Sequence, residues 1–163
     1  MLRKSGIVLM AIGALVFVRA ANADVHTFVL TMDGLQEVTN DGIPGQGDPD
    51  GMGLATLMID DADNTIDWNI DVSNITLPPT GAHIHQAVQG MNGPIVVNFS
   101  GMLTGMDLMD ADLANVLANP SGFYVNVHNS DFPAGAIRGQ IPEPATVGLL
   151  ALGGLALLRR KRG

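Results

Sequence analysis

Two segments of this chain alternate between apolar and polar residues without a break, and this pattern constrains the fold more than any other feature. The segments are Thr65–Ser73 and Phe123–His128. Their apolar positions are Ile66, Trp68, Ile70 and Val72 in the first and Phe123, Val125 and Val127 in the second. Because the side chains of a strand point alternately to opposite faces, each segment predicts a half-buried antiparallel strand.

Five more segments, bounded by clusters of Gly, Pro and Asn, also have the composition of strands. They span residues 25–32, 54–60, 82–86, 95–99 and 136–141. One helix is predicted over residues 110–118, with Asp110 as its N-cap and Asn119-Pro120 at its end. Seven short strands and one small helix predict an all-β fold, an antiparallel sandwich or barrel.

Both ends of the chain are predicted to be hydrophobic targeting helices, so neither belongs to this fold. Residues 1–23 have a basic start, an apolar run over 6–18 and the small residues Ala21-Asn22-Ala23. This is the layout of a secretory signal peptide that is cleaved between Ala23 and Asp24. The chain is therefore predicted to leave the cytoplasm.

The C-terminal end reads in order as Pro142-Glu143-Pro144, an apolar helix over residues 145–158 and a basic cluster over 159–162. A helix of this length extends about 21 Å at 1.5 Å per residue, which is shorter than the roughly 20 residues of a comfortable membrane span. The basic cluster would hold its far end on the cytoplasmic side. From these physical properties alone, a permanent C-terminal anchor is one interpretation.

The same arrangement resembles the PEP-CTERM sorting signal of Gram-negative, polysaccharide-secreting bacteria. The matching features are Pro142, Glu143 and Pro144, the helix with Gly153-Gly154, and the basic end. The resemblance implies that the tail over 141–163 anchors the chain in the membrane transiently and that an exosortase then removes it. The protein would be released to the cell surface or the extracellular matrix.

The predicted mature segment, residues 24–140, is strongly acidic. It carries 14 Asp and Glu37 against Arg138 alone, a formal charge of −14, and no Cys occurs anywhere in the chain. Such a surface repels nucleic acids and attracts divalent cations, or it serves as an adaptation to ion-rich surroundings. Two acidic turns, 48–51 and 61–64, resemble parts of a calcium loop but lack the EF-hand spacing, so they predict weak calcium binding at most.

Three of the four histidines are candidates for a metal site. His83 and His85 share one face of their predicted strand, with Ile84 facing the core, and His128 lies on the face of its strand opposite the apolar residues. If the two strands are neighbours, three imidazoles converge on an outer face, a ligand set that suits zinc or copper. The second interpretation is that these histidines bond to loop backbones without a metal. His26 fits neither interpretation and is predicted at the surface.

Other side chains are expected to support such a site. Tyr124, Asn126 and Asp131 are candidates to orient the histidines by hydrogen bonding. Thioethers are soft ligands for Cu(I) and also fill gaps in a core, so both roles are open for the methionines in this region. These are Met102, Met106 and Met109.

Five motifs in order resemble a CHRD domain, the module repeated in chordin and found singly in many secreted bacterial proteins. They are Leu35-Gln36-Glu37-Val38, Gly81-Ala82-His83-Ile84-His85, Asn92-Gly93-Pro94-Ile95-Val96, Tyr124-Val125-Asn126-Val127-His128 and Pro133-Ala134-Gly135-Ala136-Ile137-Arg138-Gly139-Gln140. The resemblance covers nearly all of residues 24–140 and implies an immunoglobulin-like β-sandwich. The biochemical activity of this family is poorly defined.

The histidine strands also resemble the copper-ligand strands of copper/zinc superoxide dismutase. This second resemblance implies a superoxide-dismutase-like antiparallel β-sandwich, which is close to the immunoglobulin-like one. This chain has no evident bridging histidine and no Cys pair, so a mononuclear site is expected at most. Two functions follow as hypotheses. One is an exported structural or binding module that contacts extracellular polysaccharide or other surface proteins. The other is a copper or zinc protein that acts on superoxide or another small oxidant.

Overall fold

The structure is a computed structural model that describes residues 24–143. The predicted signal peptide, Pro144 and the predicted helix over 145–158 lie outside the described residues. Among residues 24–143, no helix has both the length and the apolar character needed to cross a membrane.

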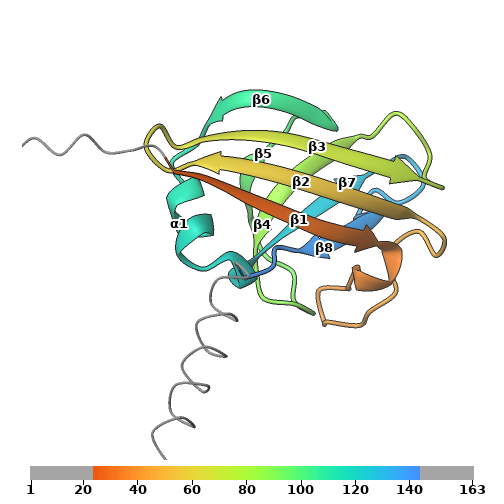
Figure 1. The fold of residues 1–163 in the computed structure, drawn as a ribbon. Helices are drawn as coiled ribbons and strands as arrows, with labels where there is room; N and C mark the ends of the chain where they lie inside the picture. Colours follow the sequence, from red (N-terminus) through yellow and green to blue (C-terminus); the bar gives the residue numbers. More distant parts are fainter. Residues whose placement is uncertain (1–23, 144–163) are drawn as a thin grey trace, which may run out of the picture.

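The described chain forms one antiparallel sheet of eight strands in the order β5-β4-β7-β8-β1-β2-β3-β6. The strands are β1 (Val25–Asp33), β2 (Met52–Asp60), β3 (Thr65–Ser73), β4 (Gly81–Gln86), β5 (Ile95–Asn98), β6 (Thr104–Met109), β7 (Phe123–His128) and β8 (Ile137–Gln140). The sheet curls so that β1, β2, β3 and β6 cross in front of the other four strands (Figure 1). The predicted all-β antiparallel fold is confirmed.

Apolar side chains fill the space between the two halves of the curled sheet. Trp68 stacks on Phe99, with ring centroids 4.4 Å apart, and its Nε1 donates a hydrogen bond to the Met102 carbonyl at 3.0 Å. The Phe99 amide also bonds to the Ala82 carbonyl on β4. The segment between β5 and β6 therefore contacts both β3 and β4, and it links the two edge strands of the sheet.

The helix is shorter than the sequence predicts. Helix α1 spans Leu113–Ala118, and Asp112 rather than Asp110 occupies the N-cap position, without a side-chain capping bond. The Asp110 carboxylate instead accepts a hydrogen bond from the Asp112 amide at 2.9 Å. This is the type of bond that an N-cap side chain makes, but here it holds a turn before the helix. The helix begins at Leu113, three residues later than predicted, so the prediction of Asp110 as its N-cap is wrong. Leu113 is buried against the core, as its position on the apolar face predicts.

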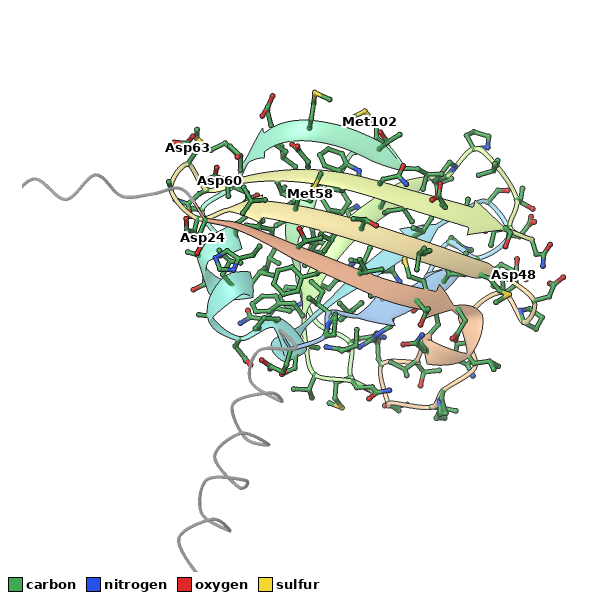
Figure 2. All side chains as sticks on the ribbon, viewed as in Figure 1. Asp24, Asp48, Met58, Asp60, Asp63 and Met102 are labelled. Atoms are coloured by element: carbon green, nitrogen blue, oxygen red, sulfur yellow. The ribbon has the colours of Figure 1, made fainter. Side chains whose placement is uncertain are left out.

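Strand β6 has no counterpart among the predicted strands, because its apolar residues do not alternate. Its pairing with β3 shifts register between Ile66 and Trp68, and Asp107 has a positive φ of 56°. The methionines of this region, Met102, Met106 and Met109, are 52%, 75% and 72% exposed. Met102 lies at the upper edge of the molecule (Figure 2). The expectation that these side chains fill the core is therefore wrong.

Candidate metal centre

The sheet brings the three candidate histidines together because β4 and β7 are antiparallel neighbours. Gly81 pairs with His128 in their register, and His83 and His85 follow along β4 on the same side. Ile84, between them, is fully buried in the core on the other side. Directly paired residues share a face of a sheet, so all three imidazoles lie on the face opposite the core. His26 lies apart on β1, where its Nε2 is 3.7 Å from an Asp61 carboxylate oxygen and its side chain is 39% exposed.

The three rings are close enough to bind one ion. One ring nitrogen from each of His83, His85 and His128 lies within 4.8 Å of the other two. The ring centroid of His83 lies 5.6 Å from that of His85 and 5.2 Å from that of His128, and the ring planes are inclined by 84° and 67°. Among residues 24–143, this is the one group of three or more His, Cys, Asp or Glu side chains with such spacing. The predicted calcium turns form no comparable group there.

Hydrogen bonds to loop carbonyls set the tautomer of two of the rings. Nδ1 of His85 lies 2.9 Å from the Gly93 carbonyl oxygen, and Nδ1 of His128 lies 3.0 Å from that of Pro133. A carbonyl oxygen only accepts, so each Nδ1 carries a hydrogen and donates it. The lone pair of each neutral ring is then on Nε2. The loop bonds that the second interpretation expects are present at His85 and His128, and they use Nδ1 and leave Nε2 without a partner.

Three of the four remaining ring nitrogens of the cluster are buried and unpaired. Nε2 of His85, Nε2 of His128 and Nδ1 of His83 have no hydrogen-bond partner among residues 24–143. Buried polar atoms in native proteins nearly always have a partner, and each exception needs an explanation. Three such exceptions at one place, one on each ring, make this cluster the candidate site for a ligand that accepts nitrogen lone pairs.

Burial keeps these rings neutral at physiological pH. The pKa of His83 is lowered to about 4, mainly by desolvation and also by repulsion from His128 and His85. Desolvation also lowers the pKa of His85 and of His128. A metal ion binds the neutral imidazole, so no proton has to leave at pH 7 before binding.

Gly81 makes room for two of the rings. A Cβ at this position would lie 2.8 Å from Cε1 of His83 and 3.3 Å from Cδ2 of His128. Any other residue would displace His83 or bend the start of β4. The sequence carried a signal for this role, since a glycine two residues before a strand histidine marks a close approach of another group.

The groups that orient the histidines differ from the expected ones. Tyr124 stacks on His85, with centroids 4.9 Å apart and planes inclined by 10°. Asn126 instead donates its side-chain amide hydrogen to Glu37, and Asp131 accepts a hydrogen bond from Thr76 at 2.5 Å. The orienting hydrogen bonds come from two backbone carbonyls, which a sequence pattern does not reveal.

The face that carries the histidines is not an open outer face. Tyr124, Asn126 and Arg138 are each at most 3% exposed, because the loops over 34–51 and 87–94 fold across them. The Arg138 guanidinium lies over the Tyr124 ring, 3.4 Å from its centroid. Burial raises the pKa of Glu37 to about 7, although the charge of Arg138 acts in the opposite direction. The histidines stand at the edge of this buried polar layer and are half-buried.

The fold and the cluster define an all-β domain with three histidines that converge on one face of a curled antiparallel sheet. The CHRD domain family matches residues 21–141, and the PEP-CTERM protein-sorting motif matches residues 140–162. The chain therefore belongs to the CHRD domain family. The two matches together describe an exported protein that an exosortase recognises and sorts to the surface of a Gram-negative bacterium. No curated protein and no solved structure matches the chain.

Proposed function

We propose that this exported module binds one copper or zinc ion at the cell surface. The ligands are Nδ1 of His83, Nε2 of His85 and Nε2 of His128, and a fourth position stays open. Two observations support the proposal. One ring nitrogen of each histidine lies within 4.8 Å of the other two, and one nitrogen of each ring is buried without a hydrogen-bond partner among residues 24–143. Three imidazole nitrogens suit both metals, and the general order of affinities favours Cu(II) over Zn(II).

The geometry needs only a small adjustment to hold an ion. Metal–nitrogen bonds of about 2.0–2.1 Å place ligand nitrogens about 3.3–3.6 Å apart in tetrahedral or trigonal sites. A separation of up to 4.8 Å between the ring nitrogens therefore has to shorten by about 1 Å. Small rotations about the side-chain bonds of His83 and His128 achieve this, because these two rings are half-buried rather than locked in the core.

The charge of the domain supports metal binding more than turnover of superoxide. Acidic side chains lie at one end of the molecule, where Asp24, Asp60 and Asp63 are found (Figure 2), and residues 24–140 carry a formal charge of −14. A surface of this sign concentrates cations near the protein and repels superoxide, which is an anion. We therefore favour a module that captures metal ions in the extracellular matrix, where it also acts as a structural or binding component beside polysaccharide and other surface proteins.

Metal analysis of residues 24–143 tests the proposal. This segment is suitable because the buried core residues of the described chain form one cluster within it. We expect one equivalent of copper or zinc per chain after dialysis against each metal alone. Binding to the folded state also raises stability, by about 2.7 kcal/mol when the free metal is at 100 times its Kd. A metal content well below one equivalent, with an unchanged melting temperature, would contradict the proposal.

We further propose that the exosortase removes the tail and leaves the module free at the surface. Mass spectrometry of the surface protein is then expected to show a chain that begins at Asp24 and lacks residues 145–163. The chain that is still bound in membranes before processing serves as the control. It is expected to contain both the module and the tail over 145–163. Tail peptides in the surface form would instead indicate a permanent anchor.

A further inference from the structure

A buried cation lies behind one of the proposed ligands. Strand β7 lies between β4 and β8, so Tyr124 has His85 as its neighbour on one side and β8 on the other. The Tyr124 ring is stacked with His85 at 4.9 Å, and the Arg138 guanidinium lies over it at 3.4 Å. Because β4 and β8 flank β7 from opposite sides, the tyrosine ring is sandwiched between the imidazole and the guanidinium. These two distances place the guanidinium carbon within about 8 Å of the centre of the imidazole.

The loop over 87–94 fixes the guanidinium in this position. Nη1 of Arg138 donates to the Asn92 side-chain oxygen at 3.3 Å, and Nη2 donates to the Val88 carbonyl at 3.3 Å. Asn92 is itself held by its amide, which donates to the Val38 carbonyl at 2.9 Å. The guanidinium is therefore tied to a loop on the same face as the histidines.

The same loop also fixes the other two members of the stack. The Gly93 carbonyl accepts from His85, and the Gly93 amide donates to the Tyr124 hydroxyl at 3.4 Å. A Cβ at Gly93 would lie 1.9 Å from the Gln86 carbonyl oxygen, so the loop takes this path only with glycine. The loop over 87–94 thus contacts all three members of the stack, His85, Tyr124 and Arg138.

We propose that Arg138, acting through Tyr124, makes the metal site favour Cu(I) over Cu(II). This inference rests on the proposed metal site and identifies a residue that sets its preferred oxidation state. A fixed positive charge makes each additional positive charge on a nearby ion less favourable. At about 10 Å and an effective dielectric constant near 20, one unit charge changes such an equilibrium by about tenfold.

The buried arginine has a stronger influence on the ion than the acidic surface does. Arg138 is 1% exposed, so solvent ions cannot approach it, whereas charges at the surface are screened beyond about 8 Å at physiological salt. Glu37 is the other buried charged group of this layer. Its pKa is raised to about 7, so at pH 7 it is about half protonated and offsets the arginine only in part.

The copper midpoint potential of residues 24–143 tests this inference. The probe is copper alone, an electrode supplies the single electron that reduces Cu(II) to Cu(I), and the EPR signal of Cu(II) reports the ratio. We expect Arg138→Gln to lower the ratio of Cu(I) to Cu(II) about tenfold at a fixed potential, which corresponds to about 59 mV. Arg138→Lys, which keeps the charge, is expected to remain close to the wild-type ratio.

The outcomes separate this inference from the metal site itself. Absence of stoichiometric copper in the wild-type chain would overturn the proposed function and the inference with it. Stoichiometric copper in a folded Arg138→Gln variant with an unchanged ratio would overturn the inference alone. If Arg138→Gln does not fold, Asn92→Asp replaces it, because that variant places a carboxylate beside Nη1 and offsets the charge without removing the arginine. A fall in the same direction is expected, smaller because Asn92 is exposed, and an unchanged ratio would overturn the inference.

Discussion

His128→Ala is expected to lower the affinity of residues 24–143 for copper by at least about 100-fold. His128 is the only candidate ligand that β7 contributes, so its loss leaves two ligands from β4 and opens the proposed site on one side. Loss of a group that merely orients a metal ligand typically costs 10- to 100-fold in affinity, and loss of the ligand costs at least as much. The fold is expected to survive, because His128 is the half-buried last residue of its strand. Titration calorimetry with a competing chelator measures the change.

His26→Ala provides a matched control for this prediction. It makes the same substitution at a histidine on β1 that lies outside the cluster, with a side chain 39% exposed beside Asp61. We expect copper affinity to remain unchanged in this variant. An equal loss in both variants, or no loss in His128→Ala, would contradict a site formed by the three imidazoles.

Period-two alternation predicted β3 and β7 because it follows from backbone geometry alone, and turn-forming residues at their ends marked the other five predicted strands. Each of the seven predicted segments corresponds to a strand of the structure, with bounds that differ by at most two residues. The pattern could not predict β6, since the register shift opposite Ile66 and Trp68 breaks the alternation. It also could not place the start of α1, where the choice between Asp110 and Asp112 depends on one local hydrogen bond.

The three clustered histidines were predictable because the face on which a strand residue lies follows from counting. His83 and His85 are two residues apart, and the position of His128 opposite the apolar residues of β7 put it on the same side. What counting could not show is that β4 and β7 pair, or that Gly81 lies directly across from His128.

The environment of the cluster was not predictable, since it is built by loops distant in sequence. Alternation marks Tyr124 and Asn126 as facing away from the core, which suggests solvent, yet both are buried. The loops over 34–51 and 87–94 cover them and bring Glu37 and the Gly93 carbonyl to this face. These contacts depend on long-range packing, and no local pattern encodes them.

Acidification from pH 6.5 to 4 is expected to destabilise the metal-free domain and to release the metal from the loaded one. In the unfolded chain a histidine has a pKa near 6.5, whereas burial lowers the pKa of His83 in the folded domain to about 4. Between these values the unfolded state binds more protons than the folded state, so stability rises with pH. The stabilising effect of a neutral His83 is therefore complete above pH 6.5 and is lost as the pH falls toward 4. Because His83 is half-buried, we expect about 1–2 kcal/mol after allowance for solvent screening.

The melting temperature, measured from pH 8 to 4 with excess EDTA and with excess zinc, provides the test. His83→Gln is the control, because glutamine keeps a polar side chain but does not titrate. The difference between wild type and this variant removes the contribution of the 14 aspartates, which both proteins share. We expect the metal-free difference to shrink as the pH falls. The zinc-dependent rise of the wild type should persist well below pH 6.5, since the folded histidines take up protons only at lower pH. A metal-free difference that grows on acidification would contradict the assignment of buried, neutral imidazoles, because a protonated His83 would then be the form that the fold stabilises.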